Sequence, residues 1–279
     1  MQDLKITIIQ SDIHWEDIEA NLAMFEEKIW QNDGLSDIII LPEMFSTGFS
    51  MNAPKLAELM NMRTTRWMKH MAEQTGALIL GSFIVSVHGR FYNRLVWMEP
   101  NGNHKTYDKR HLFRMEQEHK TYAQGESLLV ATWKGWRICP LICYDLRFPV
   151  WSRNTYDPIQ KKLNFDLMIY VANWPMTRIE AWNTLLKARA IENLCYVVGV
   201  NRTGMDGRGV EYNGNSAIIG PKGDPIFQLE GMEFIRTTEI SANSLLAFRD
   251  NFPAYLDGDD FSIEFETFES TDLLSGKSQ

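Results

Sequence analysis

In three segments of the chain, a chemically reactive side chain stands at the end of an apolar run. Residues 38–43 end in the carboxylate of Glu43, residues 138–143 end in the thiol of Cys143, and Lys109 follows a shorter strand-like run. In layered α/β proteins the carboxyl ends of the strands line the active crevice. A thiol nucleophile, a carboxylate base and an ammonium group gathered there would suit attack on a carbonyl carbon.

Each of these residues also has an ordinary structural explanation. Most strand cysteines are inert packing, a lone glutamate is more often a cap or a solvated carboxylate, and Lys109 stands in a charged run. Their joint occurrence at three strand ends favours a catalytic site instead. Because Cys143 leaves a buried strand just ahead of a predicted helix start, outward-pointing backbone N–H groups are expected to lower the pKa of its thiol and to hold an oxyanion.

Alternating strands and helices predict how these residues are positioned. The pattern predicts strands over residues 6–10, 37–41, 78–87, 127–132, 136–143, 165–173 and 196–201, hairpins over 93–107 and 216–229, and helices over 15–30, 56–76 and 179–193. Such alternation indicates an α/β layered architecture whose sheets are covered by helices. No low-complexity linker divides the chain, so one domain is predicted over residues 1–252, followed by an acidic tail over 253–279 that frays at its end.

Composition limits what the protein can bind. The 279 residues carry a net charge of −8 without a long basic run, which argues against nucleic acid and anionic membrane surfaces as partners. On one strand, Cys139 and Cys143 would lie ~13 Å apart, whereas a disulfide needs less than about 7 Å. No apolar stretch approaches the ~20 residues of a membrane span, and the six histidines lack the spacing of metal ligands. We therefore expect a soluble cytoplasmic protein with reduced thiols and without a metal or other cofactor.

Three motifs resemble the signatures of the carbon–nitrogen hydrolase (nitrilase) superfamily. They are residues 41–45 (LPEMF), 107–113 (YDKRHLF) and 141–148 (LICYDLRF), and the similarity extends over roughly residues 5 to 230 in the expected order. The resemblance implies a four-layer α-β-β-α sandwich that usually forms a homodimer through its helices. It also implies that Cys143 is the nucleophile, Glu43 the general base and Lys109 the third member of a triad. The ammonium group of Lys109 and the backbone N–H of Tyr144 would then stabilise the oxyanion.

Family members carry a second glutamate that orients the nucleophile and the leaving amine. The loop over residues 115–120 offers Glu116 and Glu118 for this role. Glu118 is favoured because His119 follows it and the turn over residues 122–125 resembles the family loop. Glu116 remains the alternative.

The motif around the cysteine also suggests the substrate. The resemblance is closest to the ω-amidase branch, in which the arginine that matches Arg147 binds the substrate carboxylate. A fixed guanidinium can bind a carboxylate with two hydrogen bonds. The alternative is that Arg147 pairs with Asp145 or Glu192. Trp174 and Phe49 are predicted to wall the pocket, although Trp174 could equally be a core residue. Phe49 stands in a loop where other branches of the family place a hydroxyl or longer insertions, so the sequence does not fix the length of the substrate.

These features predict hydrolysis of the terminal amide of a small 2-oxo dicarboxylate monoamide, such as 2-oxoglutaramate or 2-oxosuccinamate, through a cysteine thioester. Two alternatives stay open. An N-carbamoyl amino acid hydrolase or an aliphatic amidase would use the same triad with another pocket, and a non-catalytic relative would lack a triad member. No triad member is missing from the sequence.

Overall fold

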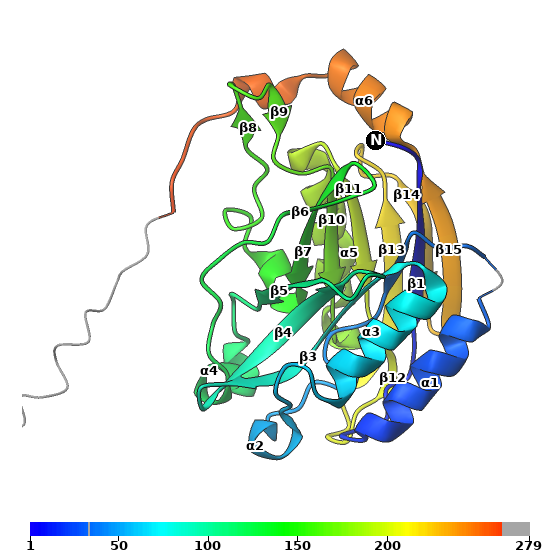
Figure 1. Ribbon diagram of the computed structural model, residues 1–279. Helices are drawn as coiled ribbons and strands as arrows, with labels where there is room; N and C mark the ends of the chain where they lie inside the picture. Colours follow the sequence, from blue (N-terminus) through cyan, green and yellow to red (C-terminus); the bar gives the residue numbers. More distant parts are fainter. Residues whose placement is uncertain (33, 264–279) are drawn as a thin grey trace, which may run out of the picture.

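The computed structural model describes residues 1–32 and 34–263, and two β-sheets packed face to face form its centre (Figure 1). The first sheet contains, in spatial order, β15 (Phe234–Ile240), β1 (Leu4–Gln10), β2 (Ile38–Ile40), β3 (Leu78–Val87), β4 (Arg90–Met98) and β5 (His104–Asp108). The second contains β12 (Thr203–Met205), β13 (Glu211–Ile219), β11 (Tyr196–Val200), β10 (Leu167–Val171), β7 (Trp136–Ile142) and β6 (Ala131–Trp133), with β14 (Pro225–Glu230) paired to β13. A separate ribbon joins β8 (Tyr156–Asp157) to β9 (Lys162–Leu163).

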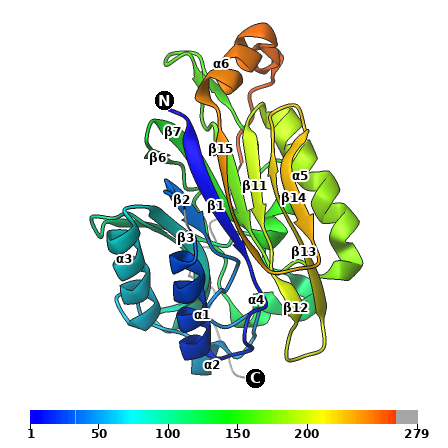
Figure 2. The ribbon, with the colours of Figure 1, turned by 90° about the vertical axis from the view of Figure 1, so that its right-hand side faces the viewer.

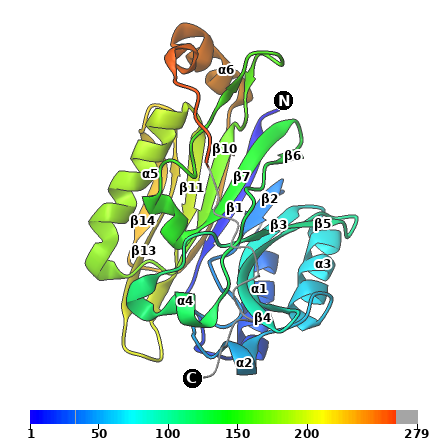
Figure 3. The ribbon, with the colours of Figure 1, turned by 90° about the vertical axis from the view of Figure 1, so that its left-hand side faces the viewer.

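The helices complete the layers. The longer ones are α1 (Ile18–Trp30), α3 (Arg63–Thr75), α5 (Ile179–Asn193) and α6 (Ala242–Asn251), and the short ones are α2 (Ala53–Leu56), α4 (Glu118–Thr121) and the 3₁₀ helices η1 (Arg114–Glu116), η2 (Cys143–Arg147), η3 (Met176–Arg178) and η4 (Ala254–Asp257). Helices α1 and α3 lie on the outer face of the first sheet and α5 on the outer face of the second (Figure 2, Figure 3). The predicted four-layer α-β-β-α sandwich is therefore confirmed.

Two sets of parallel strands form the centre of the sandwich. In the first sheet β1, β2 and β3 run parallel, and in the second β7, β10 and β11 run parallel. Their side chains are almost all buried because they face another layer on both sides. The largest apolar cluster contains residues of both sheets, such as Ile8, Leu80, Ile138 and Val198, so the core joins the two sheets into one unit.

Local signals explain where the predicted helices begin and end. The side chain of Asp17 accepts a hydrogen bond from the backbone N–H of Ala20 and caps α1. Gly76 ends α3 with a φ of 66°, the left-handed conformation that glycine adopts without strain. The prediction of one helix over residues 56–76 is wrong in its first part. Glu58 instead pairs with β3 through two backbone hydrogen bonds, and its carboxylate accepts the N–H of Thr64 at the start of α3.

At the periphery, one further prediction changes and two elements had not been predicted. The strand expected over residues 127–132 is the shorter β6, and the pattern missed both β15 and α6. Strand β15 runs antiparallel beside β1, with Thr237 opposite Thr7, so its pairing joins the two ends of the chain. Of the predicted tail, residues 264–279 lie outside the described part. No helix of that described part is long and apolar enough to cross a bilayer.

Candidate active site

The nucleophile candidate lies at the junction of a strand and a helical turn. Strand β7 ends at Ile142, and Cys143 opens η2 with a φ of 44°, in the left-handed region that costs energy for a residue with a Cβ atom. The buried side chain of Asp145 holds this turn. Its Oδ2 accepts hydrogen bonds from the Ile142 N–H (3.1 Å) and the Tyr107 hydroxyl (2.8 Å), while Oδ1 accepts the His111 N–H (3.0 Å).

A buried cluster of three charged side chains adjoins the cysteine. The Nζ atom of Lys109 lies 2.9 Å from Oε1 of Glu43 and 3.0 Å from both carboxylate oxygens of Glu118. The charged ends of all three side chains are fully buried. Glu43 also accepts hydrogen bonds from Nδ2 of Asn93 (2.7 Å) and the backbone N–H of Asn173 (2.8 Å). The structure thus brings the predicted strand-end residues together, and it places Glu118 among them.

Asn173 connects the acid to the cysteine. It follows β10, and its Nδ2 donates a hydrogen bond of 2.6 Å to the backbone carbonyl of Glu43. Its own carbonyl oxygen lies 3.9 Å from Sγ of Cys143. The ends of β2, β7 and β10 are therefore tied together around the thiol.

The electrostatics of the thiol differ from the expectation. Burial raises the pKa of Cys143 well above its ordinary value, the negative charge of Glu43 raises it further, and Lys109 opposes the shift. The predicted lowering of this pKa is wrong, because the sulfur has lost its hydration and a carboxylate lies nearby. A thiol in this state keeps its proton at neutral pH, so it needs a base at the moment of attack.

The charges of Lys109 and Glu118 are mutually dependent. Burial alone would lower the pKa of Lys109, but attraction to Glu118 and Glu43 outweighs burial and raises it. Burial and the repulsion from Glu43 raise the pKa of Glu118, against the opposing attraction of Lys109. Lys109 therefore remains an ammonium group. The alternative second glutamate, Glu116, lies apart from this cluster and pairs with Arg208 at 2.7 Å.

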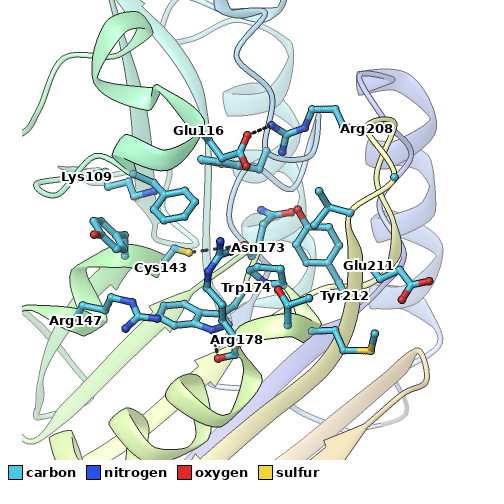
Figure 4. Close-up of a pocket in the computed structure, with 18 residues that line it drawn as sticks. Lys109, Glu116, Cys143, Arg147, Asn173, Trp174, Arg178, Arg208, Glu211 and Tyr212 are labelled. Atoms are coloured by element: carbon cyan, nitrogen blue, oxygen red, sulfur yellow. Dashed lines mark hydrogen bonds and ion pairs between the residues drawn. The ribbon is translucent and has the colours of Figure 1, made fainter.

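A cavity of about 390 Å³ opens above Cys143 and Lys109 (Figure 4). Aromatic side chains from several loops line it, namely Phe49, Phe113, Tyr144, Trp174 and Tyr212. A mostly apolar cavity of this size with a few charged groups is typical of a site for a small molecule. Among the described residues, no group of histidine, cysteine, aspartate and glutamate side chains could hold a metal ion.

The predicted substrate-binding residues all line this cavity. The Arg147 guanidinium carbon lies 5.0 Å from the centre of the Trp174 ring, and no carboxylate of the described residues pairs with it. Asp145 is taken up by the contacts above and Glu192 by Arg189, so the alternative pairing of Arg147 is absent. Trp174 is both core and wall, because its buried indole also packs on Trp182.

Phe49 and Tyr144 shape the cavity near the charged cluster. The buried ring of Phe49 lies 5.0 Å from Nζ of Lys109, which covers that ammonium group. Tyr144 follows the cysteine, and its ring packs edge-on against Phe113 and Phe148.

Four residues of the site were not assigned a role from the sequence. Asn93 holds Glu43, Asp145 holds the cysteine turn, and Arg178 and Arg208 line the cavity. Asn93 lies between Tyr92 and Arg94 on β4, so only the structure shows that its amide is fully buried and needs a polar partner. Asp145 and Arg208 also have near partners in Ile142 and Asp206. The contacts that place the other three residues in the site are distant in the sequence: Tyr107 and His111 for Asp145, Glu116 for Arg208, and Met115 for Arg178.

Comparisons with known proteins agree on the family. The family model described as carbon-nitrogen hydrolase matches residues 5–250. The chain is 44% identical to "Omega-amidase YafV" of Escherichia coli K12, over 94% of this chain and all of that protein. It is 31% identical to "2-oxoglutaramate amidase" of Bacillus subtilis 168, over 90% of this chain and 96% of that protein.

A solved structure supports the same assignment. The crystal structure of XC1258 from Xanthomonas campestris, a CN-hydrolase superfamily protein with an arsenic adduct in its active site, superimposes with a TM-score of 0.93 at 46% identity. The match covers 95% of this chain and all of that one. With its layered fold, its matched length and the buried glutamate–lysine–cysteine site, the chain belongs to the carbon-nitrogen hydrolase family.

Proposed function

We propose that this enzyme is an ω-amidase, which hydrolyses the terminal amide of a small 2-oxo dicarboxylate monoamide such as 2-oxoglutaramate. One observation carries the proposal: Arg147, without a carboxylate partner among the described residues, lines the same cavity as Cys143. A substrate with a carboxylate at one end and an amide at the other matches these two groups. The names of the relatives from Escherichia coli and Bacillus subtilis point to the same substrate class.

In the first half-reaction, the thiol of Cys143 attacks the amide carbon. Glu43 takes the proton from Sγ as the C–S bond forms, and the carbonyl electron pair moves to the oxygen. The resulting oxyanion is stabilised by the ammonium group of Lys109 and the backbone N–H of Tyr144. Glu43 then returns the proton to the nitrogen, the C–N bond breaks, and ammonia leaves a thioester on Cys143.

In the second half-reaction, water replaces ammonia. Glu43 takes a proton from the water as its oxygen attacks the thioester carbon, and the C–S bond breaks when the second oxyanion collapses. The sulfur recovers a proton and the dicarboxylate is released. Glu118, which is bound to Lys109 through both carboxylate oxygens, orients that ammonium group and the departing amine. The raised pKa of Cys143 fits this sequence of steps, because the thiol then stays protonated until a substrate is in place.

We also propose that the enzyme acts as a cytoplasmic homodimer. Cys139, Cys143 and Cys195 are free thiols, which persist in a reducing compartment. A second copy could bind to exposed apolar side chains on α5, such as Ile191, and after α6, such as Phe252 and Leu256. The tail after residue 252 can contribute to the same dimer contact. Light scattering on the full chain tests the dimer, and a monomer at micromolar concentration would contradict it.

The test of the activity is ammonia release from 2-oxoglutaramate. Wild type is expected to release ammonia, and Cys143→Ala to lose at least about 10⁴-fold in kcat/KM. The matched control is Cys139→Ala, a buried cysteine on the same strand that lies outside the cavity, and it is expected to keep the activity of wild type. A wild type that ignores 2-oxoglutaramate but hydrolyses N-carbamoyl amino acids or simple aliphatic amides would overturn the proposed substrate class.

A further inference from the structure

Four cationic side chains line the active-site cavity, and they differ in whether a carboxylate neutralises them. Lys109 is bound by Glu43 and Glu118. Arg208 is paired with Asp206 at 3.2 Å and, as described above, with Glu116. Arg147 and Arg178 have no carboxylate partner among the residues that the structure describes. The cavity therefore holds two guanidinium groups with unused charge, whereas the proposed substrate has one carboxylate.

Arg178 is held in position by contacts that leave most of its donors free. It ends η3, and its backbone carbonyl accepts a hydrogen bond of 2.8 Å from Nε1 of Trp174. The guanidinium carbon lies 5.4 Å from the centre of the Phe113 ring, and Nη2 lies 3.6 Å from Sδ of Met115. A guanidinium has five N–H donors and no acceptor, and the only hydrogen bond of this one within the described part goes to that sulfur. In Figure 4 the side chain of Arg178 extends into the cavity from a different element than Arg147.

We propose that Arg178 is a specificity-determining residue that selects a 2-oxo acid over the corresponding 2-amino acid. This inference rests on the proposed function. A 2-oxo group only accepts hydrogen bonds and therefore suits a guanidinium, while Arg147 binds the neighbouring carboxylate. A 2-ammonium group only donates hydrogen bonds and carries a positive charge. Beside two unneutralised arginines it is repelled, which excludes free amino acids such as L-glutamine from the same cavity.

The cavity offers little to offset this repulsion. Among the acidic residues that line it, Glu116 is already paired with Arg208, and the side chain of Glu211 points away from the cavity (Figure 4). The acids of the buried cluster are bound to Lys109. An incoming ammonium group thus finds no unpaired carboxylate directed into the cavity among the described lining residues, whereas an oxo group finds a donor in Arg178.

The experiment compares three substrates in the same protein sample: 2-oxoglutaramate, glutaric acid monoamide, which lacks the 2-substituent, and L-glutamine. In Arg178→Gln, kcat/KM for 2-oxoglutaramate is expected to fall about 10- to 100-fold, the range for losing a hydrogen bond from a charged group. The value for glutaric acid monoamide should change by less than about 3-fold, and that for L-glutamine should stay level or rise, so the preference for the 2-oxo acid collapses. Arg178→Lys, which keeps the charge, should retain part of it.

Controls separate recognition from packing. Arg236 lies over the ring of Phe227 at 5.5 Å, outside the cavity, so Arg236→Gln also removes an arginine from an aromatic face and should leave all three values unchanged. Ratios between substrates in one sample do not depend on how much of a variant is folded. If Arg178→Gln lowers all three values equally, or changes none, Arg178 does not select the oxo group. If wild type fails on 2-oxoglutaramate itself, the proposed function is at fault instead.

Discussion

Asp145 offers a quantitative test of how the fold positions the nucleophile. Its carboxylate is fully buried and accepts two hydrogen bonds at each oxygen: the Ile142 N–H and the Tyr107 hydroxyl at Oδ2, and the N–H and Nδ1 of His111 at Oδ1. The isosteric change Asp145→Asn replaces one of these oxygens by an NH₂ group. In either orientation of the amide, that group faces a backbone N–H, of Ile142 or of His111, which loses its acceptor.

The cost follows from this geometry. A buried N–H without an acceptor costs about 1–3 kcal/mol, and the bonds that remain become neutral instead of charge-assisted, which removes about 1 kcal/mol more. Asp145→Asn should therefore lower the free energy of unfolding by about 2–4 kcal/mol. The turn that keeps Cys143 in its left-handed conformation is expected to relax as well, because this carboxylate fastens the turn to its neighbours. We expect kcat to fall by at least about 10-fold, as for a small displacement of a catalytic group.

Urea unfolding and steady-state kinetics measure both effects. The unfolding midpoint should decrease with an unchanged m-value. The control is Asp250→Asn, an exposed aspartate on α6, which should stay within about 0.5 kcal/mol of wild type. If Asp145→Asn unfolds at the midpoint of wild type and keeps its kcat, the four hydrogen bonds do not hold the cysteine turn.

Other predictions concern the charged cluster and the substrate anchor. Glu43→Gln removes the negative neighbour of Cys143, so the pKa of the thiol should fall towards its ordinary value. Thiolate absorbance should then appear at lower pH than in wild type, even though amidase activity is lost. An unchanged or raised thiol pKa would contradict the role of Glu43 in the shift. Glu118→Gln should lower kcat by about 10²- to 10⁴-fold, whereas Glu116→Gln should have a much smaller effect in the same assay; equal losses would remove the distinction between the two. Arg147→Lys should raise KM for 2-oxoglutaramate about 10-fold or more with little change in kcat, and an unchanged KM would remove Arg147 from carboxylate binding.

Features that depend on local sequence could be predicted well. The apolar runs that end in Glu43 and Cys143 are buried parallel strands, and the ends of those strands meet. Gly76 ends a helix as its type suggests. These features could be predicted because hydrophobic periodicity and backbone preference act within a few residues.

Features that depend on distant contacts could not be predicted. The pairing of β15 with β1 joins segments about 230 positions apart, and the weak apolar pattern of β15 gave no strand signal. The role of Asp145 depends on Tyr107 and His111, which come from another strand end. The direction of the Cys143 pKa shift depends on the lost hydration of the sulfur itself and on the negative charge of Glu43, which comes from a strand end about 100 positions away in the sequence.

The central claim is that amide hydrolysis proceeds through a thioester on Cys143. The most direct measurement is rapid quenching of the wild-type enzyme with 2-oxoglutaramate into acid, followed by intact-mass and peptide analysis. A covalent adduct equal in mass to the substrate minus ammonia is predicted on the peptide that contains Cys143, and it should be absent from Cys143→Ala. Steady turnover by Cys143→Ala, or an adduct of that mass on Cys139 or Cys195 instead, would contradict it.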